Sequence, residues 1–472
     1  MVKYCPNLNI FTTDINSKNS AIIIGTTIQT NPEKNSPLEE ISHFDGNIEN
    51  CFESWSGRWI CIYNDEIYLD FSGLLACNYT KIDGEIWISS SVALLAGIMG
   101  DTSEYEDEIY SSRAHWYIRP GTKNSSIKGL LPSQTLNVLT GEIRIRDIYV
   151  NFNDAQRREV SYEIMKETLI TGMENLKKYY KGKVFWIPLS AGYDSRLLLA
   201  AAKYANIPVK TYTMNKENKF RRRSEIETSL VSKTDMKLPL IIARDLGIEH
   251  RMVYRKKLSK EKLDLFDQHS YKSSYENDRA YYTHGQWDWL GEDDVILLGQ
   301  VLGLGCSNAD SGFYDSSVNT SNQYEENIVL RHFNIKLGSR QQRNLNEYSE
   351  WIEYCNNSNL ERIDWRDRFY HEQRLASWLS ANQQSLDIVK PERIHLYNNK
   401  RFLFSILKLD ISERSNKDFI VRLIDELAPE LNKYPYNEPD PLLYKLKKVA
   451  VAISRKSLKE NVQTLVRKLK LK

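Results

Sequence analysis

Short segments in which apolar and polar residues alternate fill the first 150 residues of the chain. They are rich in β-branched and aromatic residues, which favour strands. The predicted strands are 21–28, 58–63, 67–71, 76–82, 85–91, 135–139 and 143–150. Asp83-Gly84 is a two-residue hairpin turn, because glycine accepts the positive φ of a type I′ turn, and Asn64-Asp65 and Thr140-Gly141 mark further hairpins. The pattern predicts a largely antiparallel β domain over residues 1–150.

The periodicity changes after residue 150. Between residues 154 and 180, apolar residues recur at helical spacing. Beyond this helix, the predicted strands are 183–189, 209–214, 250–254 and 293–299, and the predicted helices are 196–205 and 235–247. Alternating strands and helices indicate a parallel sheet with helices on both faces. The rest of the chain, to about residue 440, is predicted to be mostly helical.

The composition is that of a soluble globular protein, with 41% hydrophobic and 27% charged residues among 472. This length favours two or more domains. No apolar run approaches the roughly 18 residues of a membrane span, and the N-terminus lacks the pattern of a secretory signal. Six cysteines form no CxxC pair and eight histidines show no zinc-binding spacing. We therefore expect a cytoplasmic protein with reduced thiols.

A basic amphipathic tail is predicted over residues 441–472, after an α/β domain at 151–440. Residues 445–472 contain ten Lys or Arg and one Glu, a charge of +9, with apolar residues at helical spacing. Such a segment suits an anionic membrane surface, which would place the protein at the inner face of the membrane. Nucleic acid is not expected, because no aromatic residues are interleaved for base stacking. The alternative is a helix that caps the domain and ends in a basic, frayed turn.

The turn between strand 183–189 and helix 196–205 carries the clearest chemistry. It contains Ser190, Gly192, Asp194 and Ser195. A tight turn into a helix presents free backbone N–H groups and a partial positive charge, which together bind anions. The serine hydroxyls can donate to phosphate oxygens, and Asp194 could hold a Mg²⁺ that bridges phosphates. The alternative is an ordinary helix cap.

The pattern SxGxDS at 190–195 resembles the SGGxDS pyrophosphate loop of the ATP-pyrophosphatase fold, and its neighbours are similar to the asparagine synthetase family. The segments 57–91 and 119–136 resemble that family's class II glutamine amidotransferase-type (Ntn-like) domain and the stretch that follows it. The segments 211–215 and 235–250 match its synthetase domain. The resemblance implies backbone contacts to the nucleotide from Leu189, Met214 and Gly299, and a loop of Ser190, Ala191, Gly192, Asp194 and Ser195.

What the resemblance implies is ATP- and Mg²⁺-dependent amide formation. A small-molecule or peptide carboxylate attacks the α-phosphorus of ATP, and an amine or ammonia then displaces AMP from the acyl-adenylate. Two acceptors fit: a sugar acid of a bacterial surface polysaccharide, or a peptide closed into a lasso-type macrolactam or a β-lactam-like ring. The rival hypothesis is a catalytically impaired nucleotide-binding scaffold. A homodimer is an open alternative to a monomer.

Four departures from the family pattern bear on activity. Residue 2 is Val where the family has its cysteine nucleophile, and Cys5 would need a cut after Tyr4, so we expect no glutamine hydrolysis. Ala191 replaces a loop glycine, which costs strain only if the position needs positive φ. Two further positions are altered.

The two altered positions lie later in the chain. Gln300 stands where the family has a catalytic Glu, with Asp310 the next acid along, and Lys433 lies four residues before the place of the family's late lysine. Two other stretches are candidate substrate contacts: Arg221–Arg223, otherwise an exposed basic loop, and Arg374, Trp378 and Gln383, which otherwise pack as a helix face.

Overall fold

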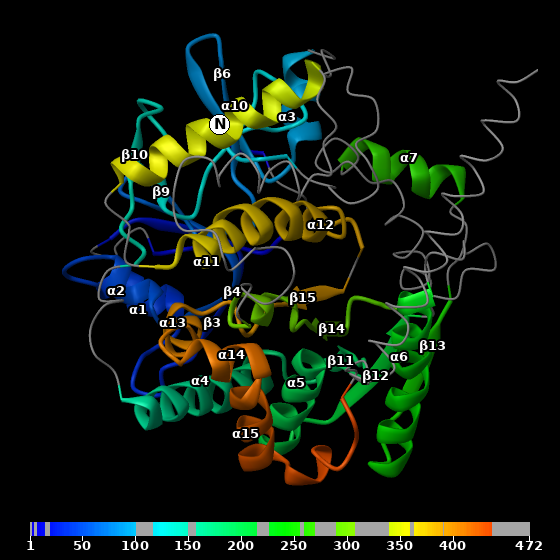
Figure 1. Ribbon diagram of the computed structural model, residues 1–472. Helices are drawn as coiled ribbons and strands as arrows, with labels where there is room; N and C mark the ends of the chain where they lie inside the picture. The colour runs from blue at the N-terminus through cyan, green and yellow to red at the C-terminus, as the bar shows by residue number, and fades with distance from the viewer. Residues whose placement is uncertain are drawn as a thin grey trace, which may run out of the picture.

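The computed structural model has a mostly antiparallel β part followed by a parallel α/β part (Figure 1). The described residues are 2–3, 7–14, 19–100, 117–149, 157–214, 226–254, 259–269, 289–306, 339–358, 363–389 and 391–436. Cys5, Arg221–Arg223, Asp310 and the predicted tail at 441–472 lie outside these residues, so the hypotheses about them stay predictions.

The first part of the chain forms two sheets. The six-stranded sheet has the order β10-β9-β5-β4-β3-β2 and is antiparallel throughout. Its strands are β2 (Ile10–Thr12), β3 (Ala21–Gln29), β4 (Trp55–Tyr63), β5 (Glu66–Leu69), β9 (Gln134–Asn137) and β10 (Ile143–Ile145). The second sheet has the order β1-β7-β6-β8. Its strands are β1 (Val2–Lys3), β6 (Asn78–Ile82), β7 (Glu85–Ser89) and β8 (Lys128–Gly129).

The predicted hairpin turns are confirmed by their backbone. Asp83 and Gly84 have φ of 50° and 87°, and Asn64 and Asp65 have φ of 48° and 62°. Both pairs therefore adopt the left-handed conformations that a type I′ turn requires. Because such turns fix the register of the strands they join, these dipeptides position β4 against β5 and β6 against β7.

The two sheets pack face to face and carry helices on their outer faces. Ile60 and Ile67 of the six-stranded sheet share a buried cluster with Ile88 of the other sheet. On the opposite face of the six-stranded sheet, Trp55 and Trp59 pack against α1 (Pro37–His43) and α2 (Glu49–Phe52). Helix α3 (Val92–Met99) packs against the four-stranded sheet. The order of layers is helix, sheet, sheet, helix.

The second part of the chain contains a five-stranded parallel sheet of order β13-β12-β11-β14-β15. Its strands are β11 (Val184–Pro188), β12 (Val209–Met214), β13 (His250–Val253), β14 (Asp294–Leu297) and β15 (Glu392–Ile394). The first four confirm the predicted strands. The fifth, β15, was not predicted: it is three residues long and lies in a stretch expected to be helical. The parallel sheet itself is confirmed.

Helices cover one face of this sheet. The strand residues Phe185, Ile187 and Val295 share one large core with residues of several helices. These helices are α4 (Arg158–Tyr179), α5 (Tyr193–Tyr204), α6 (Ile226–Asp245), α13 (Lys400–Leu407) and α15 (Asp418–Leu427). The other face forms a cluster around Trp186 and Tyr212 that contains no helix residue within the described part of the chain. Helices were expected on both faces of the parallel sheet. Within the described residues, helices pack on one face, and the face with Trp186 and Tyr212 has no helix residue in its cluster.

The remaining helices differ in detail from the predictions. Their bounds are α7 (Lys260–His269), η3 (Gln300–Leu304), α10 (Ser339–Asn357), α11 (Trp365–Phe369), η5 (Tyr370–Leu379), α12 (Ser380–Gln384), α14 (Ile411–Asn416) and η6 (Pro429–Leu431). Helix α6 starts at Ile226, earlier than the expected start at Asp235. Element η5 is π-helical, a rare form that recurs near functional sites. No helix in the described ranges is long and apolar enough to cross a bilayer.

Candidate functional site

The loop at 189–192 lies at the carboxyl end of β11, where the chain enters α5. Strands β12 and β14 flank β11 in the sheet, so their carboxyl ends lie beside the loop. Ligands of open parallel sheets bind outside this edge, where loops and helix N-termini converge. Strand pairing thus brings three residues to the same edge of the sheet: Ser190 after β11, Met214 at the end of β12, and Gly299 after β14.

The serines of the loop bind each other and do not cap the helix. Ser190 N donates to Ser195 Oγ at 3.1 Å, the two hydroxyls are 3.2 Å apart, and Gly192 N donates to Ser190 Oγ at 3.1 Å. The residue before the helix is Gly192, and no side chain caps α5 there. An ordinary serine or aspartate cap is therefore not what this turn provides. Both hydroxyls are held together at the amino end of α5.

Ala191 carries no backbone strain. It does not have positive φ, and its side chain is fully buried in the core behind the loop. The alanine that replaces the family's glycine is therefore accommodated by packing. Its N–H donates to Asp235 Oδ1 at 3.1 Å, so a carboxylate from α6 already lies against the loop. Asp235 thus joins the site from within a helix, not from the start of one.

Asp194 lies in the first turn of α5 against Gly299. A Cβ placed on Gly299 would be 3.1 Å from Asp194 Cβ, so any larger residue would require Asp194 to shift by a few tenths of an ångström. Burial raises the pKa of the Asp194 carboxyl to about 6, and nearby Lys417 partly offsets the rise. Tyr397 donates its hydroxyl proton to the Asp194 carbonyl at 2.9 Å and helps to fix the turn. The carboxyl predicted to bind metal is therefore held in place and easily protonated.

Lys417 was not predicted from the sequence. It joins α14 to α15 with a left-handed φ of 63°, and its Nζ lies 4.6 Å from the centre of the Tyr193 ring. Its charge acts on Asp194. No motif marks this lysine, because it reaches the loop only through the packing of α15 against α5. A non-glycine residue in the left-handed conformation is the one local sign of a special position.

The predicted lysine, Lys433, lies elsewhere. Its side chain is exposed, with Nζ 4.9 Å from the ring of the adjacent Tyr434. Its charge acts on Asp245, at the far end of α6, and on Glu430. The structure therefore places Lys417, and not Lys433, near enough for its charge to act on Asp194. A catalytic role for Lys433 stays an untested prediction.

Gln300 is exposed at the start of η3 and pairs with Gln383 of α12. Gln383 Nε2 donates to Gln300 Oε1 at 2.9 Å. The preceding residue, Gly299, lies against Asp194 in the first turn of α5. The amide pair is therefore next to a residue that contacts this turn. The predicted catalytic position thus holds a neutral amide bound to another amide.

Element η5 supplies the neighbouring wall. The Tyr370 hydroxyl packs against Gly303, where an added Cβ would lie 2.4 Å from it. Burial raises the pKa of Tyr370 to about 12, and the negative charge of Asp194 contributes to the rise. The Arg374 guanidinium stacks 3.7 Å from the centre of the Trp378 ring. Of the three residues that the sequence offered as one helix face, Arg374 stacks on Trp378 and interacts with Tyr370, and Gln383 pairs with Gln300.

The backbone positions offered for the nucleotide are partly occupied. Leu189 N donates to Tyr212 O at 2.9 Å, and Leu189 O accepts from Thr213 Oγ1 at 2.6 Å. Met214 ends β12 and is half-buried. A nucleotide would therefore share the Leu189 carbonyl with Thr213, whereas Gly299 faces Asp194 directly.

The last described residues pack across the loop. Tyr436 stacks on Tyr193 with ring centres 4.0 Å apart and planes 4° apart. Arg196 of α5 donates to the carbonyls of Tyr434, Pro435 and Ala191 at 2.8, 2.9 and 3.2 Å. One buried guanidinium therefore joins the segment 434–436 to the loop.

No protein-family model matches the sequence, and the comparison with curated proteins finds no match. Among solved structures, the chain is similar to the NH3-dependent NAD synthetase from Campylobacter jejuni subsp. jejuni NCTC 11168 in complex with the nitrate ion. The identity is 13% and the TM-score 0.21, over 47% of this chain and 94% of that chain. It is also similar to the glutamine-dependent NAD+ synthetase from Acinetobacter baumannii in complex with ADP. There the identity is 10% and the TM-score 0.20, over 78% of this chain and 79% of that chain. TM-scores this low define neither fold nor activity, so the site is interpreted from its own geometry.

Proposed function

We propose that the chain is an ATP-dependent ligase that forms amides by the asparagine synthetase route. The observation that carries the proposal is the arrangement at the carboxyl edge of the parallel sheet. Two serine hydroxyls, a helix N-terminus, the lysine Lys417 and the acid Asp194 meet there. Hydroxyl and amide donors with one cation suit a leaving pyrophosphate, because preorganised donors stabilise developing negative charge. This combination is what separates the site from a simple helix cap.

The reaction that fits has two balanced steps. A carboxylate oxygen attacks the α-phosphorus of ATP, which forms an acyl-phosphate bond and releases pyrophosphate. An amine nitrogen then attacks the acyl carbon, releases AMP and loses one proton. In the first step Ser190, Ser195 and the first N–H groups of α5 would hold the pyrophosphate, and Lys417 would balance part of its charge.

Magnesium fits the acids that flank the loop. Mg²⁺ in phosphate sites is held by one or two carboxylates and by substrate oxygens. Asp194 and Asp235 both lie at the loop and would hold the ion there. When bound, the ion would neutralise phosphate charge. Within the described residues no group of three His, Cys, Asp or Glu side chains forms a metal site, so phosphate oxygens would have to complete the coordination.

The β part supports an Ntn-like amidotransferase domain without glutaminase activity. Its helix–sheet–sheet–helix layering is the architecture expected for that domain. We propose that the amine comes from the substrate or from free ammonia, and that the domain serves mainly to support the α/β part. The acceptor, a sugar acid or a peptide carboxylate, stays open.

Carboxylate-dependent exchange of pyrophosphate into ATP tests the proposal. Aspartate, a uronic acid and an acidic peptide should be offered separately, with Mg²⁺. We expect exchange with one class, and losses of roughly 100-fold for Asp194→Asn and Lys417→Met, since single charge-stabilising groups contribute about that much. Lys237→Met, an exposed lysine of α6, is the matched control, and Lys433→Met compares the lysine predicted from sequence.

A second candidate is a nucleotide-binding scaffold without catalysis. It is favoured by Gln300, which places an amide where a catalytic acid was expected, and by Asp235, whose carboxylate already accepts the Ala191 N–H. ATP binding by calorimetry, with no exchange for any carboxylate, would support the scaffold and contradict the ligase.

A further inference from the structure

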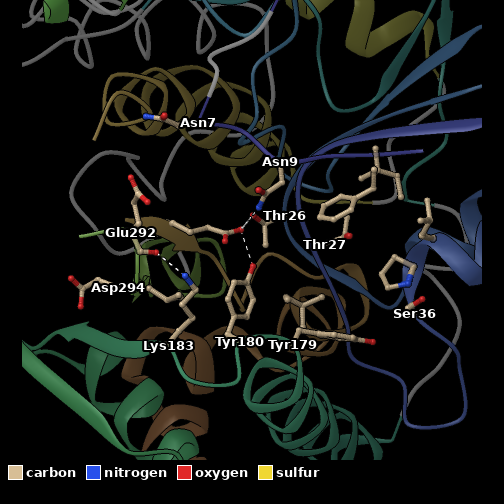
Figure 2. Close-up of a pocket in the computed structure, with 17 residues that line it drawn as sticks. Asn7, Asn9, Thr26, Thr27, Ser36, Tyr179, Tyr180, Lys183, Glu292 and Asp294 are labelled. Carbon is tan, nitrogen blue, oxygen red and sulfur yellow. Dashed lines mark hydrogen bonds between the residues drawn. The ribbon is translucent and has the colours of Figure 1, made fainter. Parts of the chain in front are cut away.

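A cavity of about 650 Å³ lies at the opposite end of the parallel sheet from the loop (Figure 2). It opens where β11, β14 and β15 begin, next to Lys183, Asp294 and Glu392. Strand β3, helix α1 and the end of α4 provide the other walls. The volume falls within the range of small-molecule sites, about 300–1,000 Å³. The proposed ligase chemistry makes no use of this space.

The carboxylate of Glu392 is fixed by donors on one oxygen only. Its Oε1 accepts from Tyr180 Oη at 2.8 Å, from Asn9 Nδ2 at 3.1 Å and from Thr26 Oγ1. Its Oε2 accepts no hydrogen bond from any residue in the described ranges, and the residue lines the cavity. Three neutral donors therefore orient the group while its second oxygen keeps its capacity to accept a hydrogen bond.

The charges around the cavity are mostly negative. No lysine or arginine forms an ion pair with Glu392 among the residues that the structure covers. The lining lysine, Lys183, is already bound to Asp293 Oδ1 at 2.8 Å and to Glu292 O at 3.0 Å, as Figure 2 shows for Glu292. Glu292 adds a further acid to the lining, whereas both carboxylate oxygens of Asp294 already accept hydrogen bonds at 2.7 Å, from Trp186 Nε1 and Gly291 N. The field therefore favours a cation.

The lining also contains polar, apolar and aromatic side chains, the polar ones including Asn7, Thr27 and Ser36. Leu38 presents aliphatic surface, whereas Ile23, Ile28 and Val295 are at most 1% exposed and form the packed floor. Tyr179 and Phe11 also line the cavity and are 43% and 42% exposed. Aliphatic walls suit an alkyl chain, and aromatic faces attract cations. A hydrated metal ion would gain nothing from these walls, whereas a cation with an organic body would gain from both.

We propose that this cavity binds an organic ammonium ion with an aliphatic body, such as an alkylamine or polyamine. The ammonium group donates to Glu392 Oε2, and the alkyl part lies against the aliphatic walls. The site lies across the sheet from the loop, so occupancy does not depend on ATP. The proposal is independent of the ligase activity and stands or falls separately from it.

Titration calorimetry of the full chain with hexylammonium chloride and with 1-hexanol tests the charge. The two probes share one alkyl chain and differ in the head group. We expect hexylammonium to bind at least tenfold more tightly, because a hydrogen bond between charged groups contributes about 1.5–3 kcal/mol. Equal affinities, or no binding of the amine, would overturn the proposal.

Two variants identify the site. Glu392→Gln keeps an oxygen for the three donors and removes the charge, so the preference for the amine should fall at least tenfold. Leu38→Trp should reduce the binding of both probes by filling the cavity. Glu163→Gln, an exposed acid of α4, is the matched control and should leave both affinities unchanged. Thermal melting would verify that each variant is folded. A folded Glu392→Gln that binds hexylammonium as tightly as the wild type contradicts the assignment.

Discussion

Asp194 is an acid held in surroundings that disfavour its charge. Burial raises its pKa to about 6, while Lys417 acts in the opposite direction. At neutral pH the folded state therefore keeps a charge that the unfolded state would hold more easily. Such strain is common at functional sites, where stability is exchanged for reactivity. Under the proposed function, the same burial would favour a cation that arrives with phosphate and balances this carboxylate.

Asp194→Asn should stabilise the fold at neutral pH. The folded pKa lies above the unfolded value of about 3.9, so the wild-type carboxyl is destabilising above pH 6. The gain should be on the order of 1 kcal/mol after solvent screening and should vanish as the pH falls towards 4. Urea unfolding at pH 7.5 and at pH 4 measures it. An equal gain at both values would contradict a charge effect.

At the residue scale, the sequence predicted the loop but not its partners. Ser190, Gly192, Asp194 and Ser195 lie within six positions, so a local pattern reveals them. Lys417 is more than 200 positions away and Asp235 more than 40, and both reach the loop only through helix packing. A single sequence carries no signal for such contacts. The alternative lysine, Lys433, is suggested only by the family resemblance, and it lies four residues before the place that the family pattern expects.

Element η5 joins the two parts of the molecule through a buried histidine. His371 Nε2 donates to Phe71 O at 2.7 Å, and His371 Nδ1 accepts from the Tyr149 hydroxyl at 2.8 Å. This assignment requires the neutral ring, because a protonated Nδ1 could not accept. Burial lowers the pKa of His371 to about 3. The contact between η5 and the β part therefore depends on a ring without charge.

Acid should weaken the molecule through this histidine. Its folded pKa lies below the unfolded value of about 6.5, so the stability it contributes is present above pH 6.5 and is lost as the pH falls towards 3. The free energy of unfolding should thus decline below pH 6.5. His371→Gln should be less stable at pH 7. Between pH 6.5 and 4, its free energy of unfolding should fall with pH less steeply than that of the wild type, by the contribution of about one proton. Chemical unfolding across this range measures both slopes, and parallel slopes would contradict the assignment.

At the element scale, prediction succeeded where structure is local. Asp83-Gly84 and Asn64-Asp65 determine their hairpins because the turn needs their backbone freedom. Strand β15 was missed because three residues, Glu392–Ile394, show no alternation and pair only with β14. The early start of α6 at Ile226 was missed as well.

The two parts of the molecule meet through buried polar contacts. Arg58 of β4 donates to both carboxylate oxygens of Asp387 at 2.5 and 2.9 Å, and its Nε donates to Leu74 O. Asn398 donates to Asp70 and to Gly57 O at 2.7 Å in each case. The contacts of Arg58 with Asp387 and of Asn398 with Asp70 and Gly57 join residues more than 300 positions apart in sequence, so no local pattern predicts them. We expect the two parts to unfold together.

Arg58→Met should destabilise the whole molecule. The change leaves the buried Asp387 carboxylate without its arginine, which typically costs about 3–5 kcal/mol. Arg144→Met removes an exposed arginine that pairs with Glu142 and with Glu66, and it should destabilise the molecule much less than Arg58→Met. Urea unfolding followed by fluorescence and by circular dichroism measures both changes. Two separate transitions in the wild type would contradict joint unfolding.

The segment 434–436 has a mechanical consequence for the loop at 189–192. Tyr436 is stacked on Tyr193 and joined to the loop through Arg196. Tyr436 therefore lies beside the turn that is proposed to bind phosphate. A force applied at Tyr436 would act first on Arg196 and on the amino end of α5, so the position of this tyrosine and the geometry of the loop are mechanically connected.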